Sequence, residues 1–270
     1  MTQQADEYQL ELQNISMNFG GITALDNVSF SVKKGEIFSI IGPNGAGKTT
    51  IFNCISRVYT PQHGSIIFEG QNILKLRTHQ IAPLGIARTF QNVELFSHMT
   101  VLNNLMLGRH YRINCGPIAG GVFLGKGQRV EIEHRKKAEE IIEFLEMEDI
   151  RKEMVKNLPF GSQKRVELGR ALAMDPRVLL LDEPVSGMNM EETEDIARFI
   201  IDINEELGIT CIVVEHDMGV VMDISHRVTA IDFGEKIAEG TPDEVQNDPE
   251  VIKAYLGSED LVVGRRLEED

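Results

Sequence analysis

The stretch EIFSIIGPNGAGKTT, residues 36–50, constrains the fold more than any other part of this 270-residue chain. Residues 36–41 form an apolar, partly β-branched run, which predicts a buried strand. Glycines interrupt that run, and we expect a helix to begin at Lys48. A strand, a glycine-rich loop and a helix in this order direct backbone N–H groups and a helix N-terminus at phosphate oxygens. The stretch therefore predicts a phosphate-binding loop, and the alternative is a glycine-rich turn without a ligand.

The residues of this loop have separate expected tasks in binding a nucleotide and its magnesium ion. Lys48 would reach the β- and γ-phosphates, Thr49 would give its hydroxyl to Mg²⁺, and Thr50 would support the α- or β-phosphate. The backbone of the loop would surround the phosphate oxygens. The predicted nucleotide-binding residues of the loop are Gly42, Pro43, Asn44, Gly45, Ala46, Gly47, Lys48, Thr49 and Thr50.

Two acidic residues follow a second predicted strand. Residues 178–181, VLLL, predict a fully buried parallel strand, and Asp182 and Glu183 lie at its carboxyl end, where open α/β sheets place their ligands. Adjacent side chains on a strand point to different sides, so the two carboxylates can take different tasks. We expect Asp182 to bind Mg²⁺, directly or through water, and Glu183 to orient or deprotonate a water that attacks the γ-phosphate. The alternative is a solvated strand end.

A third buried strand is predicted in TCIVVEHDM, residues 210–218, again with polar residues at its carboxyl end. His216 is placed there to donate a hydrogen bond to the γ-phosphate or to the attacking water. A lone histidine is more often structural, so the residues by themselves leave both interpretations open.

The charge balance and the apolar content exclude several classes of protein. The chain has 27 basic and 42 acidic residues, a net charge of −15, which argues against nucleic acid or anionic lipid as a bulk partner. No apolar run approaches the roughly 18 residues that a membrane span needs, and the polar N-terminus is not that of a signal peptide. Three scattered cysteines indicate reduced thiols in a cytosolic setting.

The motifs GPNGAGKT, LLLDEP and VVEHD, in this order, resemble those of the ABC transporter ATPases. The resemblance extends from about Leu10 to about Leu256. It implies an α/β fold in which a P-loop NTPase (RecA-like) core carries an antiparallel β subdomain and an α-helical signature subdomain. It also implies that His216 is the switch histidine of the family.

Two more residues take their roles from this resemblance. IARTFQNVELF resembles the family's Q-loop, whose glutamine, here Gln91, would sense the γ-phosphate through metal and water and face the membrane subunit. ISMNFGGITALDNVSF resembles the entry hairpin, which would place the ring of Phe19 against adenine. The expected catalytic residues are thus Glu183, His216 and Gln91. The expected metal-binding residues are Thr49, Gln91 and Asp182.

The chain is expected to form a single ABC ATPase domain over residues 1–258, followed by a charged C-terminal tail over 259–270. The helical subdomain would span about 92–170, including an insertion at 109–127. That insertion is rich in glycine, which favours a surface loop, and a contact with the permease is the alternative. Residues 128–148 predict an amphipathic helix with one apolar face, made of Ile132, Ile141, Ile142 and Leu145.

The stretch NLPFGSQKR, residues 157–165, resembles the family signature LSGGQ at only two of five positions. In the family this motif completes the nucleotide site of the partner subunit. The residues expected to face ATP bound by a second ATPase are Leu158, Gly161, Ser162 and Gln163. Pro159 has neither the hydroxyl nor the N–H of the usual serine. Either this composite site is weaker, or the proline is a variant without cost, and both remain open.

One branch of the family is most similar to this chain. RTFQN, segment 109–127, the run LxxGxQKRVELGRAL and the ending FGEKIAEGTPDEVQNDPEVIKAYLG resemble LivG-type importers of branched-chain amino acids. The resemblance implies an ATPase that uses ATP and Mg²⁺ to power amino acid uptake. It implies a second ABC ATPase in a hetero- or homodimer, two integral-membrane permeases and, indirectly, an external solute-binding protein, but no nucleic acid. The expected location is the cytoplasmic face of the inner membrane, with a subunit that is soluble when isolated.

Other functions remain as alternatives to this interpretation. Amide or urea importers and lipid or lipopolysaccharide exporters use related ATPases, and their solutes are chosen by other subunits. A more distant alternative is a P-loop ATPase or kinase with no role in transport.

Overall fold

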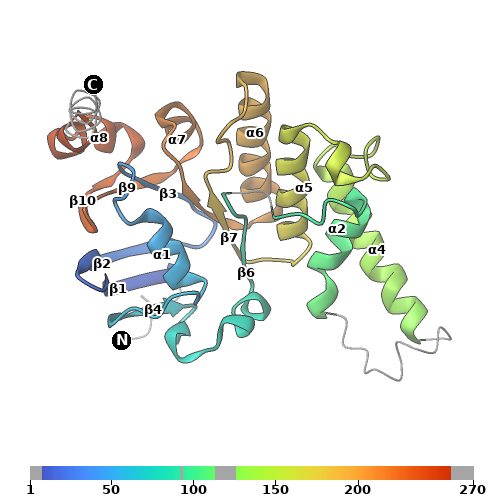
Figure 1. Ribbon diagram of the computed structural model, residues 1–270, viewed down its shortest axis with the longest axis horizontal. Coiled ribbons are helices and arrows are strands. Elements are labelled where there is room, and N and C mark those ends of the chain that lie inside the picture. The colour runs from blue at the N-terminus through green and yellow to red at the C-terminus, as the bar shows by residue number, and fades with distance from the viewer. Residues whose placement is uncertain (1–7, 92–93, 113–125, 257–270) are drawn as a thin grey trace.

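The computed structural model describes residues 8–91, 94–112 and 126–256. Two sheets form its framework, with helices packed beside them and a further group of helices at one end (Figure 1).

The larger sheet presents the strand ends on which the predicted site depends. Its strand order is β10-β9-β3-β8-β7-β6, with β9, β3, β8, β7 and β6 parallel and β10 antiparallel to β9. Every residue of β3, β7 and β8 is buried, which explains their continuous apolar runs. The strands are β3 Ile37–Ile41, β6 Ile86–Arg88, β7 Val178–Asp182, β8 Thr210–Val214, β9 Arg227–Asp232 and β10 Glu235–Gly240.

The smaller sheet is antiparallel, as the resemblance implies, with the order β2-β1-β4-β5. Its long hairpin of β1 and β2 buries Leu10, Leu12 and Phe30 against the same core that receives Phe38 of β3 and Phe52. These strands are β1 Tyr8–Phe19, β2 Ile22–Lys33, β4 His63–Phe68 and β5 Gln71–Asn72. The two sheets therefore share one hydrophobic core.

Helices follow four strands of the larger sheet and pack beside it. They are α1 Lys48–Ile55 after β3, α6 Met190–Leu207 after β7, α7 Met218–Ile224 after β8 and α8 Pro242–Gln246 after β10. Residues 249–256 are also helical. Short 3-10 turns lead from β5 to β6: η1 Ile73–Lys75, η2 Thr78–Gln80 and η3 Ala82–Leu84. This arrangement confirms the predicted α/β fold class.

A separate group of helices lies on the right of Figure 1. It contains α2 Val101–Gly108, α4 Lys126–Phe144 and α5 Phe160–Leu172, with the short turns η4 His110–Arg112 and η5 Val155–Asn157. Leu105, Ile142 and Leu172 belong to one buried cluster that joins these helices to β7. The group matches the expected helical subdomain, whose boundaries stay a prediction. Residues 113–125 of the expected insertion and the tail at 259–270 lie outside the described residues.

The prediction for the apolar face of α4 was wrong at one residue. Ile141, Ile142 and Leu145 are buried, but the side chain of Ile132 is 60% exposed. Ile132 precedes Ile141 by about two and a half helical turns, so the two side chains leave opposite sides of the helix. The buried face continues towards the N-terminus through Ala138 and His134 instead.

Within the three described ranges, every helix is too short or too polar to cross a membrane.

Candidate nucleotide-binding and hydrolysis site

The predicted phosphate-binding loop joins β3 to α1, as its sequence indicates. Gly42, Gly45 and Gly47 have φ angles of 148°, 85° and 107°, a backbone region that favours glycine. A Cβ atom at Gly42 would collide with the carbonyl oxygen of Ile231, and one at Gly47 would lie 2.6 Å from the carbonyl oxygen of Ala24. The path of the loop therefore requires glycine, and neighbouring strands hold it from outside.

The ammonium group of Lys48 lies inside this loop. Its Nζ donates hydrogen bonds to the carbonyl oxygens of Gly42, at 2.6 Å, and Pro43, at 3.0 Å. Burial lowers the pKa of Lys48, while the carboxylates of Glu183 and Asp182 oppose that shift. The positive charge is thus held between the loop and the acidic strand ends. Thr49, in the first turn of α1, is exposed and can present its hydroxyl to a ligand.

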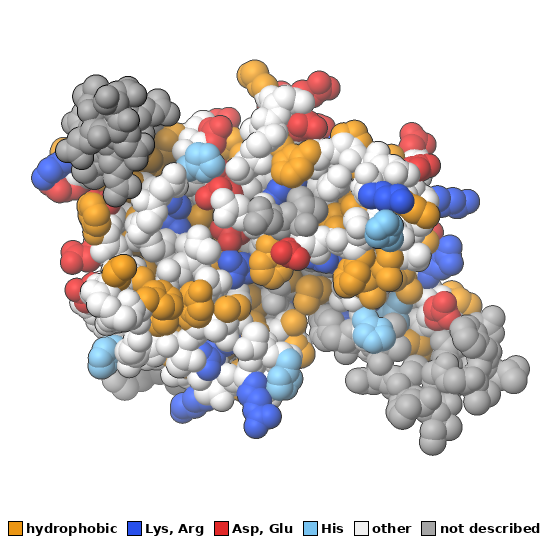
Figure 2. All heavy atoms as spheres, in the orientation of Figure 1, with side chains coloured by type: hydrophobic (Ala, Val, Ile, Leu, Met, Phe, Trp, Pro, Cys, Tyr) orange, Lys and Arg blue, Asp and Glu red, His pale blue; other side chains and the backbone are white. Residues whose placement is uncertain are grey.

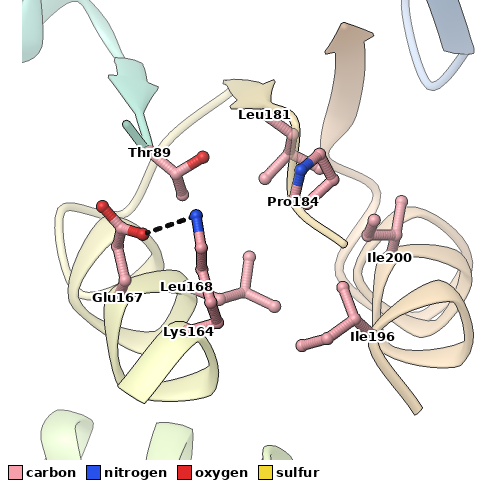
Figure 3. A pocket seen from close by; sticks show the side chains of 8 residues that line it. All are labelled: Thr89, Lys164, Glu167, Leu168, Leu181, Pro184, Ile196 and Ile200. Carbon is pink, nitrogen blue, oxygen red and sulfur yellow. Dashed lines mark ion pairs between the residues drawn. The ribbon is translucent and has the colours of Figure 1, made fainter. Parts of the chain in front are cut away.

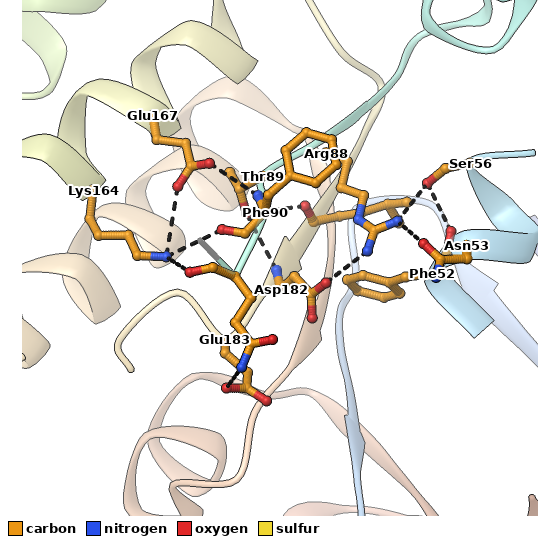
Figure 4. A network of polar contacts seen from close by, with 12 residues as sticks. Phe52, Asn53, Ser56, Arg88, Thr89, Phe90, Lys164, Glu167, Asp182 and Glu183 are labelled. Atoms are coloured by element: carbon orange, nitrogen blue, oxygen red, sulfur yellow. Dashed lines mark hydrogen bonds and ion pairs between the residues drawn. The ribbon is translucent and has the colours of Figure 1, made fainter. Parts of the chain in front are cut away.

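Asp182 ends β7 and is paired with a cation that the sequence analysis did not assign. Arg88, from the end of β6, donates from Nη2 to Asp182 Oδ2 at 2.8 Å, and both side chains are at least nine-tenths buried. The same guanidinium donates to Asn53 Oδ1 at 2.8 Å (Figure 4). It lies over the rings of Phe52 and Phe90, 5.5 and 5.2 Å from their centroids. Arg88 is therefore fixed by α1 and by the segment before Gln91.

The second carboxylate oxygen of Asp182 fits a divalent cation. Oδ1 is buried and has no hydrogen-bond partner among the described residues, and buried polar atoms normally have one. Within the same residues, no group of three or more histidine, cysteine or acidic side chains is arranged to hold a metal ion. Mg²⁺ bound to a nucleotide needs only one or two protein ligands, because phosphates and waters supply the rest. The donor set therefore fits a nucleotide-borne Mg²⁺ better than an ion held by protein alone.

The three expected catalytic side chains meet at one carboxylate. Gln91 Nε2 donates to Glu183 Oε2 at 3.0 Å, and His216 Nδ1 lies 3.8 Å from the same oxygen. The residues come from the ends of β6, β7 and β8, which are neighbours in the sheet. Glu183 adopts a left-handed φ of 48°, and its N–H donates to the carbonyl oxygen of Val214 at 2.9 Å. Such a backbone costs free energy and is typical of functional sites.

Glu215 is a buried carboxyl group next to this cluster, and a role for it was not predicted from the sequence. Its side chain is fully buried, and it accepts hydrogen bonds from the backbone N–H groups of Val185, His216 and Asp217 at 3.1, 3.0 and 3.4 Å. Burial raises the pKa of Glu215. The carboxyl group ties the segment after Glu183 to the segment of His216, while the His216 side chain itself stays half exposed.

Phe19 has a partly exposed ring. It ends β1 at the tip of the hairpin, its side chain is 42% exposed, and its ring meets that of Tyr59 edge-on at 5.1 Å between centroids. The following strand, β2, touches the phosphate loop at Gly47 through Ala24 and Leu25. Phe19 is therefore on the strand pair that borders the loop, and its contact with adenine stays a prediction.

The signature residues do not lie at the chain's own phosphate loop. Pro159 caps α5 without a side-chain hydrogen bond, and the helix begins at Phe160. Gln163 Nε2 donates to the carbonyl oxygen of Leu158 at 2.9 Å, so this side chain closes its own turn. Figure 1 shows α5 and α1 in different parts of the molecule.

The family of the chain follows from a comparison with known protein families. Residues 25–186 match the model described as ABC transporter. This chain belongs to the ABC transporter family. Residues 235–260 match a second model, described as branched-chain amino acid ATP-binding cassette transporter. The chain is thus an ABC ATPase.

Individual relatives of this ABC ATPase cover nearly its whole length. The high-affinity branched-chain amino acid transport ATP-binding protein BraF of Pseudomonas aeruginosa is 40% identical over 248 residues, 92% of this chain and 97% of that protein. LivG of Escherichia coli (strain K12), which carries the same description, is 38% identical with the same coverage. A crystal structure of an ABC transporter cassette in its ADP conformation aligns with a TM-score of 0.81 and 34% identity, covering 93% of this chain and 99% of that one.

Besides Glu215, three residues of the ABC site were not predicted from the sequence. Arg88 lies within the quoted RTFQN stretch, and Lys164 and Glu167 lie within the quoted signature run. Lys164 Nζ donates to the carbonyl oxygen of Gln91 at 2.8 Å, and Glu167 Oε1 accepts from the N–H of Phe90 at 3.1 Å. Each is a charged residue within a quoted motif, but the sequence does not identify its partner.

Proposed function

We propose that this ABC ATPase is the ATP-hydrolysing subunit of an importer for branched-chain or related amino acids. The observation that carries the proposal is the meeting of Gln91, Glu183 and His216 at one carboxylate oxygen. The solute rests on similarity, because BraF and LivG are named as branched-chain amino acid transport proteins and residues 235–260 match a model of that type. The same similarity favours this interpretation over the amide, urea, lipid and kinase alternatives.

The nucleotide would bind with its phosphates inside the glycine loop and its base against Phe19. Lys48 now donates to two carbonyl oxygens of the loop, and β- and γ-phosphate oxygens would compete for those N–H bonds. Thr49, the unpartnered Oδ1 of Asp182 and Gln91 would hold Mg²⁺. When bound, Mg²⁺ neutralises charge on the β- and γ-phosphates.

Hydrolysis would depend on a water placed beside Glu183. The carboxylate of Glu183 would orient that water and take its proton during in-line attack on the γ-phosphate. Gln91 already donates to Glu183, so it would fix one side of the carboxylate while sensing the phosphate. His216 is half exposed and close to the same oxygen, so it would donate to the γ-phosphate. Glu215 would hold the His216 backbone in place.

A second ATPase subunit is part of this proposal. The signature residues Leu158, Gly161, Ser162 and Gln163 lie apart from the chain's own phosphate loop, so a nucleotide at the start of α5 would belong to a partner. Pro159 supplies no hydroxyl there, but the N–H groups in the first turn of α5 have no partner within the helix and could bind a phosphate. A head-to-tail dimer, with either a second copy or a similar chain, brings each signature to the other subunit's ATP.

Permease subunits would dock on the face around the Gln91 segment. Large hydrophobic side chains are exposed there, and they belong to Phe90, Phe96, Met99, Met154 and Phe160. Figure 2 shows hydrophobic side chains grouped across the middle of this face. An exposed apolar cluster of this kind is typical of a protein interface. We propose that the chain works at the cytoplasmic side of a membrane through this contact.

The test is a pull-down from native membranes with Mg-ATP, using a tagged Glu183→Gln chain, followed by mass spectrometry. Removal of a general base typically lowers turnover about 10²- to 10⁴-fold, so this variant is expected to bind ATP, remain closed on it and retain its partners. The matched control is Glu183→Gln combined with Lys48→Met, which lacks the phosphate-binding ammonium.

Recovery of a second ABC ATPase and two permeases with Glu183→Gln, but not with the control, would support the importer. Recovery of the chain by itself, or with soluble or lipid-exporting partners, would overturn the amino acid importer and leave the ATPase. Wild-type turnover in Glu183→Gln would remove Glu183 from the proposed role.

A further inference from the structure

Two oppositely charged side chains are buried on α5, on the side that faces the Gln91 segment. Lys164 and Glu167 are 5% and 1% exposed, and their Nζ and Oε2 atoms lie 3.7 Å apart. Figure 3 shows both side chains on neighbouring turns of α5, where they line a small pocket with Thr89 on one side and Leu181 and Pro184 on the other. Burial raises the pKa of Glu167.

Both charges bind the main chain just before and at Gln91. Lys164 Nζ donates to the carbonyl oxygens of Gln91, at 2.8 Å, and Phe90, at 3.3 Å. Glu167 Oε1 accepts from the N–H of Phe90 at 3.1 Å. Donor and acceptor groups of the same short segment are therefore both held by one helix (Figure 4).

The residue before Phe90 is held by a different part of the molecule. Thr89 donates its N–H to the carbonyl oxygen of Leu180 in β7 at 2.9 Å, and its hydroxyl oxygen accepts from the N–H of Asp182 at 3.3 Å. The support of the chain thus changes between Thr89 and Phe90. Hydrogen bonds to the sheet hold Thr89, whereas hydrogen bonds to α5 hold Phe90 and Gln91. Gln91 lies on the α5 side of this change.

Stability alone is a weak reason for a charged pair in this position. Two charges lose their hydration when they are buried, and apolar residues of similar volume often stabilise such a site as well or better. The hydrogen bonds to Phe90 and Gln91 are what a hydrophobic pair would not provide.

We propose that Lys164 and Glu167 are positioning residues that fasten the main chain of Gln91 to α5. The inference rests on the proposed role of Gln91 in hydrolysis. Lys164 lies about one helical turn from the start of α5, where the signature would meet the partner's ATP. One helix therefore carries the contact with the partner's nucleotide and the attachment of Gln91 in this subunit. The position of α5 sets how Gln91 meets Glu183.

The test variant is Lys164→Met combined with Glu167→Met, which removes both charges together and leaves neither one buried without its partner. The matched control is Lys137→Met with Glu140→Met on α4. That pair has the same residue types and spacing, with its Nζ and Oε2 3.1 Å apart, but it lies on the surface. Both are made in the complete chain with the subunits that copurify with it.

We expect the Lys164/Glu167 variant to lower kcat for ATP hydrolysis on the order of 10-fold, because small misplacements of a catalytic group have large effects on rate. Nucleotide affinity should match wild type, since the phosphate loop is untouched. Amide exchange at Phe90 should accelerate because its N–H loses its acceptor. The Lys137/Glu140 variant should match wild type in all three measurements. A parallel loss of nucleotide affinity, or an unchanged kcat, would overturn the proposal.

A double-mutant comparison with Gln91→Ala separates this inference from the proposed function. If the buried pair acts through Gln91, adding Lys164→Met and Glu167→Met to Gln91→Ala should cause no further loss of kcat. If the losses multiply, the pair acts elsewhere and the inference fails while the role of Gln91 stands. If Gln91→Ala by itself turns over at the wild-type rate, the proposed role of Gln91 fails, and the inference fails with it.

Discussion

Arg88 links Asp182, the proposed Mg²⁺ ligand, to two other parts of the site. It pairs with Asp182 Oδ2, binds Asn53 of α1 and lies between the rings of Phe52 and Phe90. It occupies Oδ2 of Asp182, and the buried Oδ1 has no hydrogen-bond partner among the described residues. A single guanidinium therefore orients the carboxylate and compensates its charge.

Replacing Arg88 by Met should destabilise the fold. The variant leaves Asp182 buried without a cation, which typically costs about 3 kcal/mol in the free energy of unfolding. Urea unfolding followed by circular dichroism measures this. The matched control is Arg135→Met, whose partner Glu139 is one turn away on the surface of α4, and which should change stability by less than about 0.5 kcal/mol. Equal stability of the two variants would contradict the structural role of the Arg88 pair.

Residues with a local signature could be predicted, and residues with a distant partner could not. Lys48 and Glu183 stand beside short motifs whose strand, loop and helix pattern is visible in the sequence. Arg88 and Asp182 are 94 positions apart, and no pattern along the chain pairs them. The same holds for Lys164, which donates a hydrogen bond to the carbonyl oxygen of Gln91, 73 positions earlier. Only the sheet order and the packing of α5 bring these partners together.

At the scale of elements, strand and helix positions followed from hydrophobic patterns, whereas the orientation of one helix did not. The buried strands β3, β7 and β8 lie where their apolar runs predict them. In α4 the sequence prediction assigned Ile132 to the buried face of the helix, but its side chain lies on the exposed face. Packing against α2 and α5 decides the face, and it selects Ala138 and His134.

The start of α6 is stabilised by a reciprocal cap. Asn189 Oδ1 accepts from the N–H of Glu192 at 3.0 Å, and Glu192 Oε2 accepts from the N–H of Asn189 at 3.2 Å. Asn189→Ala should therefore lower the free energy of unfolding by about 1 kcal/mol. Thermal and urea unfolding measure the change, with the exposed Glu194→Ala on the same helix as the control, expected within about 0.5 kcal/mol of wild type. A smaller effect at Asn189 than at Glu194 would argue against the cap.

At the scale of the whole molecule, the helical group and the sheets leave an apolar face between them. The exposed side chains around the Gln91 segment come from the segment between β6 and α2, from Met154 just before η5 and from the start of α5, so both parts of the molecule contribute to this face. An interface that spans two parts of a subunit responds to any change in their arrangement. This suits a protein whose nucleotide chemistry must be transmitted to a partner.

Replacing Phe96 by Ala should weaken the proposed permease contact and leave nucleotide binding unchanged. Its side chain is 55% exposed within the apolar face, and loss of an aromatic anchor typically costs an interface more than 1 kcal/mol. The measurement is the amount of permease recovered with the tagged chain, beside the ATP affinity of the same preparation. The control is Phe233→Ala, which removes an even more exposed ring at the turn between β9 and β10. Equal recovery with both variants would place the permease contact elsewhere.

The change of support at Thr89 also limits how such proteins can be recombined. A chimera that exchanges α5 alone would join a new helix to a Gln91 segment fitted to the old one, and its hydrogen bonds to Phe90 and Gln91 would be mismatched. A chimera that exchanges α5 together with the residues from Phe90 onward would cut the chain where its contacts already change partner. For protein engineering, the unit of exchange is therefore defined by hydrogen bonds between segments some seventy positions apart, rather than by a continuous stretch of sequence.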